Sequence, residues 1–320
     1  MSGEAPALSV IVLVPDHLEG VAETLESLRA QDIRARMELV FVTPVATLAI
    51  DQETRAAFAN VQLVHYPEWR STAASRIAGI RVATAPVVAM VEDHCFPTPG
   101  WASALVRAHR EPWAAVGPAM LNANPTSVLS WVNLAIEYGP WLWPIARGPV
   151  DHVPGHNSSY KRDRLLEFGD RLEALFEAES VLHWELRRGG HVVAMEPEAR
   201  SRHQNFAQFG PTLGLRFHGG RHFAANRALD WPMGRRLAYA LASPLIPLLR
   251  TARTLGHMRR AAPRRLTPGF VGALLLMLVV DGFGETMGYA FGHGRSVERL
   301  NDLEFNRRRF LAVGDDAALS

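Results

Sequence analysis

The chain has 320 residues, of which 48% are hydrophobic and 21% charged, and its formal net charge is +2. This balance excludes a disordered or fibrous chain and predicts one large domain or two modest ones. The single cysteine, Cys95, excludes an intrachain disulfide framework and a cysteine-rich zinc site. No basic stretch precedes the apolar run at residues 8–14, so we expect a strand there and no signal peptide.

Short β-branched runs alternate with helical patterns over the first hundred residues. Buried strands are predicted at residues 8–14, 38–42, 61–65 and 87–91, with helices around 21–28 and 71–83. This alternation predicts a parallel α/β sheet with right-handed crossovers. In such sheets the ligand site lies at the carboxyl ends of the strands, where we therefore look for functional residues.

The next elements are a helix around 99–109, a strand around 114–120 and a helix around 127–138, followed by a loop rich in Trp, Pro and Gly at 139–155. The turn after the first strand contains neither GxGxxG nor GxxxxGK[ST]. The sequence thus disfavours dinucleotide-dependent dehydrogenases and P-loop ATPases.

An acidic pair and a histidine, Glu92-Asp93-His94, follow the fourth predicted strand. Residues two apart in an extended segment point to the same side, so Glu92 and His94 could share one ion. Carboxylate oxygen and imidazole nitrogen are suitable ligands for a divalent cation. The alternative is that these acids are merely solvated or cap a helix.

Further motifs occur in a fixed order along the chain. They are Pro15-Asp16 after the first strand, Ser75-Arg76-Ile77-Ala78-Gly79, Glu92-Asp93-His94, Gly155-His156-Asn157, Glu179-Ser180 and a late His203. In this order and spacing, residues 8–205 resemble the family 2 glycosyltransferases, with their A-R-N-x-G helix, Asp-x-Asp metal motif, G-x-N turn, Glu-Asp base motif and late histidine. The resemblance implies a GT-A fold, which is a mixed, Rossmann-like sheet flanked by helices, and sugar transfer from a nucleotide-sugar donor.

Three positions depart from the family pattern. The second strand runs into Thr43 rather than into the usual Asp residues, which leaves the nucleotide base undefined. The metal motif ends in His94, and together with His203 it is similar to an Asp-x-His plus His arrangement that favours Mn²⁺ over Mg²⁺. Ser180 stands in place of the family's Asp, and a serine hydroxyl is no general base near neutral pH. Glu179 is then the carboxylate available in that turn.

The resemblance implies a role for each matching residue. His94 and His203 would hold a divalent metal, Mn²⁺ or Mg²⁺, and Glu179 would take the proton of the acceptor hydroxyl. The expected donor-binding residues are Pro15, Asp16, Arg76, Glu92, Asp93 and Asn157.

Each role has a simpler structural alternative. Arg76 could pair with a surface acid, and His203 could be a satisfied histidine at a strand end. Glu179 could lie on a solvated helix face, with His183 one turn further on. Aromatic residues at 131, 138, 141 and 143 could stack against an acceptor sugar, pack in the core or lie at a membrane interface.

The carboxyl-terminal part is basic and apolar. Residues 213–265 contain eleven arginines and one acid, Asp230, which predicts an anionic partner. An apolar helix broken by Pro244 and Pro247 is expected at 235–253. The uncharged run at 269–280 is shorter than the roughly 18 residues of a spanning helix. We therefore expect an element lying on an anionic membrane surface rather than crossing it. The alternative is a helical hairpin packed on the catalytic domain or on a second subunit.

The predicted organisation is a GT-A domain at 1–212, a basic and apolar helical region at 213–295, and a polar helix and tail at 296–320. The predicted function is metal-dependent transfer of a sugar to a lipid-linked or polysaccharide acceptor, with inversion, at the cytoplasmic face of a membrane. A non-catalytic protein that binds nucleotide-sugar or glycan is the alternative. Nucleic acid is disfavoured as a partner because the arginines alternate with long apolar stretches.

Overall fold

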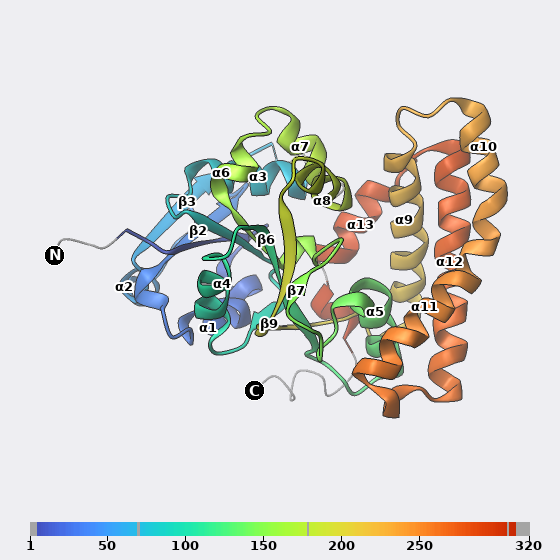
Figure 1. The fold of residues 1–320 in the computed structure, drawn as a ribbon, viewed down its shortest axis with the longest axis horizontal. Helices are drawn as coiled ribbons and strands as arrows, with labels where there is room; N and C mark the ends of the chain where they lie inside the picture. Colours follow the sequence, from blue (N-terminus) through green and yellow to red (C-terminus); the bar gives the residue numbers. More distant parts are fainter. Residues whose placement is uncertain (1–4, 69–70, 178, 306, 312–320) are drawn as a thin grey trace. The chain divides into compact units, whose positions relative to one another are not determined.

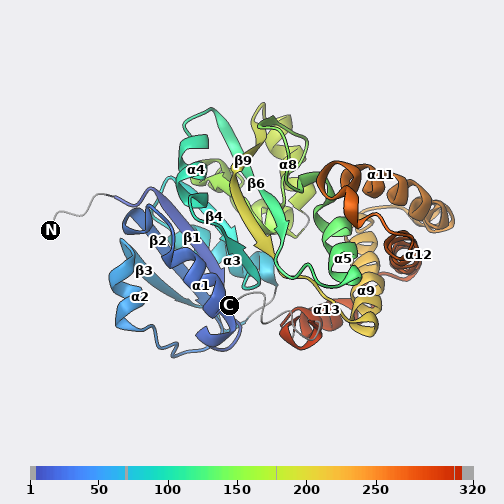
Figure 2. The ribbon, with the colours of Figure 1, turned by 90° about the horizontal axis from the view of Figure 1, so that it is seen from below.

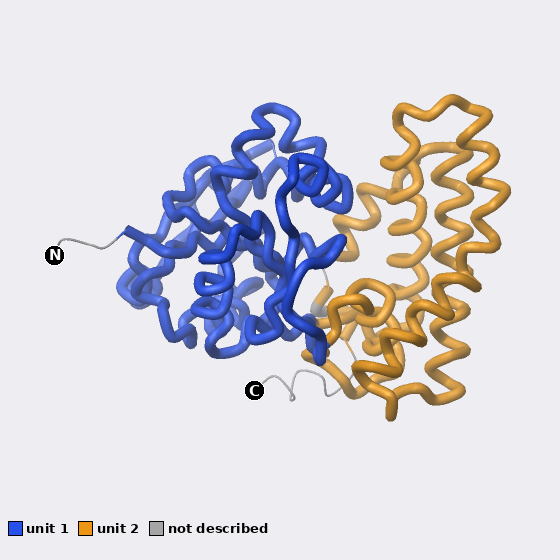
Figure 3. Tube along the Cα trace, in the orientation of Figure 1, with its two compact units in different colours: residues 1–121, 143–203 blue, residues 122–142, 204–320 orange. Residues whose placement is uncertain are grey.

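The computed structural model describes residues 5–68, 71–177, 179–305 and 307–311. The chain forms two compact units (Figure 3). Unit 1 consists of Met1–Leu121 and Trp143–His203, and unit 2 consists of Asn122–Leu142 and Gln204–Ser320. The domain boundaries at 212/213 and 295/296 stay predictions.

Four parallel strands form one half of the sheet in unit 1 (Figure 1). Their order is β3 (Asn60–His65), β2 (Met37–Thr43), β1 (Leu8–Leu13) and β4 (Val87–Val91). All four coincide with predicted strands. Side chains of β1, β2 and β4 are almost entirely buried, as their β-branched composition predicts.

The other half of the sheet contains antiparallel pairs, so the sheet is mixed. It continues from β4 through β8 (Ser159–Lys161), β6 (Trp113–Asn122), β9 (Val192–His203) and β5 (Cys95–Pro97), and β7 (Gly148–Pro149) pairs with β9. The pairs β4–β8, β6–β8 and β5–β9 are antiparallel. The parallel pattern predicted from the amino-terminal alternation therefore ends at β4.

Helices cover both faces of this sheet (Figure 1). They are α1 (Ala22–Arg29), α2 (Gln52–Ala57), α3 (Thr72–Val82), α4 (Trp101–Ala108), α6 (Arg162–Leu166), α7 (Arg171–Phe176) and α8 (Glu179–Arg188). The side chain of Ser71 caps α3 by accepting a hydrogen bond from the amide of Ala74. A Cβ on Gly79 would lie 2.7 Å from Ile11, so this glycine lets α3 pack closely on β1.

Unit 2 is helical. It contains α5 (Val128–Tyr138), α9 (Phe209–Arg227), α10 (Met233–Ala242), α11 (Ile246–Ala261), α12 (Pro268–Phe291) and α13 (Ser296–Phe305). The long helix α12 lies between α9 on one side and α10 and α11 on the other (Figures 1 and 2). A Cβ on Gly284 would lie 2.2 Å from the carbonyl oxygen of Phe217, so the contact between α9 and α12 requires glycine.

The predicted break at Pro244 and Pro247 is present, as the 3₁₀ turn η5 (Ser243–Leu245) between α10 and α11. Helix α12 is long and apolar enough to cross a membrane by length and composition, with 24 residues and a mean hydropathy of 1.7 over its most apolar window. That window is 44% buried within the protein. The helix exceeds the uncharged run seen in the sequence because it also contains Asp281 and Glu285.

Candidate metal and catalytic centre

Glu92, His94 and His203 meet at the carboxyl end of β4. The segment 92–94 joins β4 to β5, and β5 pairs with β9 so that Cys95 lies opposite His203. This pairing brings a residue more than a hundred positions away to the metal motif. The Nε2 atoms of His94 and His203 each lie 3.6 Å from Oε2 of Glu92, and the potential ligand atoms of the three residues lie within 4.8 Å of one another.

Neighbouring groups fix the orientation of this triad. Asn157 donates from Nδ2 to Oε2 of Glu92 at 2.6 Å, and its Oδ1 accepts the amide hydrogen of Glu92 at 3.1 Å. Oδ1 of Asp93 lies 2.6 Å from Nδ1 of His94. Such partners orient ligand side chains in metal sites. Asn157 and Asp93 thus contact Glu92 and His94 and orient their side chains.

The triad fits a divalent cation. His94 is buried, yet its Nε2 has no hydrogen-bond partner among the described residues. A buried nitrogen without a partner is costly, and a metal ion would satisfy it. Burial by itself would raise the pKa of the Glu92 carboxyl, but His94 and His203 outweigh this effect and hold the pKa well below its usual range. One carboxylate with two imidazoles is a donor set suited to a divalent metal ion.

A second cluster lies beside the first and contains Arg76, His156 and Glu179. Nη1 of Arg76 donates to Oε1 of Glu179 at 3.1 Å, and Nδ1 of His156 lies 3.0 Å from the same oxygen. Nη2 of Arg76 also lies 4.0 Å from Oε1 of Glu92, which connects the two clusters. Side-chain exposure is 7% for Arg76 and 12% for Glu179. These values exclude a surface ion pair for Arg76 and a solvated helix face for Glu179.

Electrostatics keep Glu179 ionised. Burial raises the pKa of its carboxyl, but the charge and hydrogen bond of His156 and the charge of Arg76 outweigh burial, so the pKa is lowered. For His156, burial lowers the pKa, and the carboxylate of Glu179 more than compensates, so the pKa is raised. His156 is half-exposed, in contrast to Glu179. A Cβ on Gly155 would lie 2.5 Å from the Glu179 carboxylate, so only glycine leaves room for this carboxylate.

Two of the predicted donor-binding residues lie apart from these clusters. Asp16 follows β1, is exposed, and pairs with His17 at 3.0 Å. The neighbouring Pro15 is partly buried. No contact described in residues 5–68 and 71–177 links either residue to Glu92. Both nevertheless lie at the same edge of the sheet, because β1 and β4 are adjacent and parallel.

Sequence reasoning missed the role of His156. In the sequence, this residue is only the middle of the Gly155-His156-Asn157 turn, and the pattern assigns it no function. The available signal was its position between a glycine and a residue already expected to bind the donor. The predicted aromatic platform is not uniform either, since Tyr138 is buried in unit 2 whereas Trp143 is exposed in unit 1.

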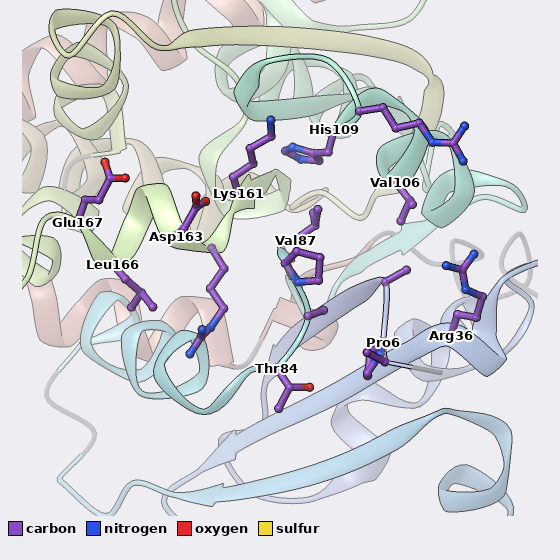
Figure 4. A pocket seen from close by; sticks show the side chains of 16 residues that line it. Pro6, Arg36, Thr84, Val87, Val106, His109, Lys161, Asp163, Leu166 and Glu167 are labelled. Atoms are coloured by element: carbon purple, nitrogen blue, oxygen red, sulfur yellow. The ribbon is translucent and has the colours of Figure 1, made fainter. Parts of the chain in front are cut away.

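A separate open pocket of about 1220 Å³ lies at the opposite edge of the sheet (Figure 4). Pro6, Thr84, His109 and Lys161 are among the residues that line it. It is formed where β1 and β4 begin, whereas Glu92 follows the end of β4. None of the predicted site residues lines it.

The mixed sheet flanked by helices, with a carboxylate and imidazole cluster after its fourth strand, is the fold of a GT-A glycosyltransferase. The family model described as "Glycosyl transferase family 2" matches residues 9–167. Residues 9–167, about half of the chain, belong to this family.

Curated relatives are glycosyltransferases. The chain is 21% identical over 285 residues to a pre-mycofactocin glycosyltransferase of Mycobacterium tuberculosis, a match that covers 87% of this chain and 54% of the relative. It is 30% identical over 167 residues to the glucosyl-dolichyl phosphate glucuronosyltransferase of Haloferax volcanii, covering 48% of this chain and 51% of the relative. The chain thus spans about half the length of the curated relatives it matches.

Among solved structures, the chain is similar to the mannosyltransferase PcManGT from Pyrobaculum calidifontis, which was solved in complex with GDP-Man and Mn²⁺. The match has a TM-score of 0.49 and 14% sequence identity, and it covers 95% of this chain and 88% of that chain.

Proposed function

We propose that the protein transfers a sugar from a nucleotide-sugar donor to a lipid-linked or polysaccharide acceptor, in a reaction that needs a divalent metal and inverts the anomeric centre. The observation that carries the proposal is the Glu92, His94 and His203 triad lying next to a second buried carboxylate, Glu179. The triad is suited to the leaving diphosphate of the donor, and the cluster around Glu179 is suited to the incoming hydroxyl of the acceptor.

On the donor side, the leaving group is a nucleoside diphosphate, whose negative charge grows as the glycosidic bond breaks. Glu92, His94 and His203 would hold a Mn²⁺ or Mg²⁺ ion. When bound, that ion supplies positive charge for the diphosphate. Arg76 is a buried guanidinium beside the triad, and it would bind the same diphosphate or the nucleotide base. Pro15, Asp16 and Asp93 are proposed to contact the rest of the donor.

On the acceptor side, Glu179 is the proposed base, and His156 acts with it. Glu179 is ionised but largely buried, whereas His156 is half-exposed, with its Nδ1 3.0 Å from Oε1 of Glu179 and 2.6 Å from Nη1 of Arg76. We therefore assign the acceptor proton to the Glu179–His156 pair rather than to either residue alone. Arg76 remains bonded to Oε1 of Glu179 and keeps this carboxylate in place.

The acceptor and the location follow from weaker observations. The Haloferax relative is named for glucosyl-dolichyl phosphate, a lipid-linked sugar, which supports an acceptor of this kind. The basic segment 213–265 supports a peripheral position on the anionic cytoplasmic face of a membrane.

The test is donor turnover by the purified protein. With added Mn²⁺, the protein should hydrolyse one nucleotide-sugar of a panel or transfer its sugar to an acceptor. Neither reaction should occur after the metal is chelated with EDTA. A thermal-shift screen with the same panel identifies the donor first, because a ligand that binds the folded state raises its melting temperature.

A non-catalytic binding protein is the second candidate. Ser180 in place of the family's Asp and Thr43 in place of the second-strand Asp both favour it. A donor that raises the melting temperature without being turned over, with any acceptor and with Mn²⁺ present, would support this candidate over the enzyme.

A further inference from the structure

A row of leucines is exposed along one side of α10 and α11. Leu237, Leu241, Leu245, Leu248 and Leu249 are between 48% and 83% exposed, and we call them the leucine face. Leu237, Leu241 and Leu245 are four residues apart, and Leu248 and Leu249 follow Leu245 by three and four. The turn η5 joins α10 to α11 through helical backbone, so these side chains form one stripe rather than two. Single exposed leucines are ordinary, but five in one stripe indicate an interaction surface.

The opposite side of the same helices is buried and partly polar. Ser243, Pro247, Arg250 and Thr254 recur at helical spacing there, and Pro247 packs against Gly282 of α12. Arg250 bonds to both Asp281 and Glu285, two acids that are themselves buried. An amphipathic helix in water turns its leucines inward and its charges outward. Helices α10 and α11 depart from this pattern, because they expose a row of leucines and direct the partly buried Arg250 toward α12, although other arginines of α10 and α11 are exposed.

Helix α12 also buries acids while it exposes some of its apolar side chains. Asp281 and Glu285 are buried among the helices, whereas Leu275, Leu276 and Phe283 are exposed. Exposed leucines therefore occur on α10, α11 and α12.

Arginines flank the leucine face on both sides. Arg235 lies in the first turn of α10, and Arg253 and Arg259 lie further along α11, and all three are exposed. Along the helix axes, these arginines therefore come before and after the leucine face. Leucines inserted at the boundary between headgroups and acyl chains, to a depth of about 5–10 Å, would leave arginines at the level of the phosphates.

Charge decides between the possible occupants of this face. A second copy of the chain would place the same arginines opposite one another, and Asp230 is the single acid of residues 213–265. Anionic lipid supplies the complementary charge together with an apolar layer for the leucines.

We propose that the leucine face inserts into the interfacial layer of an anionic bilayer, with Arg235, Arg253 and Arg259 bound to lipid phosphates. Helices α10 and α11 then lie on the membrane rather than across it. The inference rests on the proposed membrane location and does not depend on the proposed reaction.

The test is co-sedimentation of the full chain with vesicles of phosphatidylcholine alone or with phosphatidylglycerol at 30 mol %. Wild type should bind the anionic vesicles and bind less as salt rises from 50 to 500 mM. The double variant Leu241→Glu/Leu248→Glu should bind at least about tenfold less, because two inserted apolar side chains become charged. Both positions are exposed, so the fold should survive, and the melting temperature checks this.

Val128→Glu is the control, since it adds one negative charge at an exposed apolar residue of α5 outside the leucine face, against one at each of the two leucines. It should bind as wild type does. Donor turnover without vesicles, measured for every variant, keeps a failed membrane proposal separate from a failed enzymatic one.

Equal vesicle binding by wild type and the double leucine variant would overturn the proposal. So would a wild-type protein that ignores anionic vesicles at 50 mM salt and is instead a dimer dissociated by Leu241→Glu/Leu248→Glu. Release from the vesicles by detergent alone, and by neither salt nor high pH, would show insertion across the bilayer and would also overturn it.

Discussion

Both units bury charged side chains, but they balance the charges differently. In unit 1, the carboxylates of Glu92 and Glu179 lie among one guanidinium and several imidazoles, and their pKa values are lowered. In unit 2, Asp281 and Glu285 share the single guanidinium of Arg250. Burial and the charge of Asp281 raise the pKa of Glu285 to about 7.

The comparison shows what each cluster is suited for. Unit 1 holds ionised carboxylates beside neutralising groups, the state that metal binding and base catalysis require. The cluster in unit 2 has two acids bonded to one guanidinium, so it is suited to fastening α11 to α12. Variants of the two clusters should accordingly affect different measurements.

The largest effect is expected from His94→Ala. Loss of this imidazole removes a proposed metal ligand at a strand end, so metal-dependent donor turnover should be abolished while the fold persists. His65→Ala, which removes an exposed histidine at the end of β3, is the matched control and should retain turnover. A His94→Ala protein with unchanged Mn²⁺ dependence would remove His94 from the site.

Glu179→Gln should lower sugar transfer on the order of a hundredfold or more, because the acceptor proton loses its receiving carboxylate. Donor affinity, measured by calorimetry, should stay near that of wild type. Glu177→Gln, at an exposed acid in the preceding turn, should transfer normally. Normal transfer by Glu179→Gln together with loss in Glu177→Gln would move the base to Glu177.

His203→Ala should weaken metal affinity by a factor of about ten or more, since it removes an imidazole from the triad. Calorimetric titration with Mn²⁺ measures this, again with His65→Ala as the control. Equal Mn²⁺ affinity in wild type and His203→Ala would show that His203 is only a structural, hydrogen-bonded histidine at the end of β9.

The smallest effect is a pH dependence of unfolding set by unit 2. The pKa of Glu285 is about 7 in the folded protein against an ordinary value of 4.5. As pH rises from 4.5 to 7, the unfolded chain releases this proton before the folded protein does, so the free energy of unfolding should fall. The expected loss is on the order of 1–3 kcal/mol and is complete above pH 7.

Glu285→Gln, which keeps the neutral form, should show a weaker decline between pH 5 and pH 8 in urea unfolding. Glu298→Gln, at an exposed acid of α13, controls for loss of a titrating group at the surface. Parallel pH profiles for wild type and Glu285→Gln would contradict the raised pKa.

The sequence predicted the parallel half of the sheet because its strands are continuous β-branched runs. In the antiparallel half it predicted β6, as the strand around 114–120, but not the short strands. Strands β5 and β8 have three residues each, too few to show a period of two, and they are specified by pairing with β9, β4 and β6.

Within the site, spacing suggested Glu92 with His94, but only the family resemblance suggested His203. Pairing of β5 with β9 brings that residue to the triad. Asn157 contacts Glu92, and His156 contacts Glu179. Both contacts depend on how the 155–157 turn packs against β4, which no local sequence pattern encodes.

In unit 2, composition predicted a basic surface, and the structure shows that part of this charge faces inward. Arg216 bonds to Glu137, Arg236 to the carbonyl of Tyr289, and Arg250 to two acids. A count of arginines cannot separate these from Arg235, Arg253 and Arg259, which are exposed.

The central claim is that Glu92, His94 and His203 together bind a divalent metal. Electron paramagnetic resonance of Mn²⁺ titrated with wild type and with His94→Ala, each with and without a nucleoside diphosphate, tests it without relying on turnover. We predict that wild type binds one Mn²⁺ and binds it more tightly with the diphosphate, and that His94→Ala leaves the Mn²⁺ free. Identical Mn²⁺ binding by the two proteins, or none by wild type with the diphosphate present, would contradict the claim.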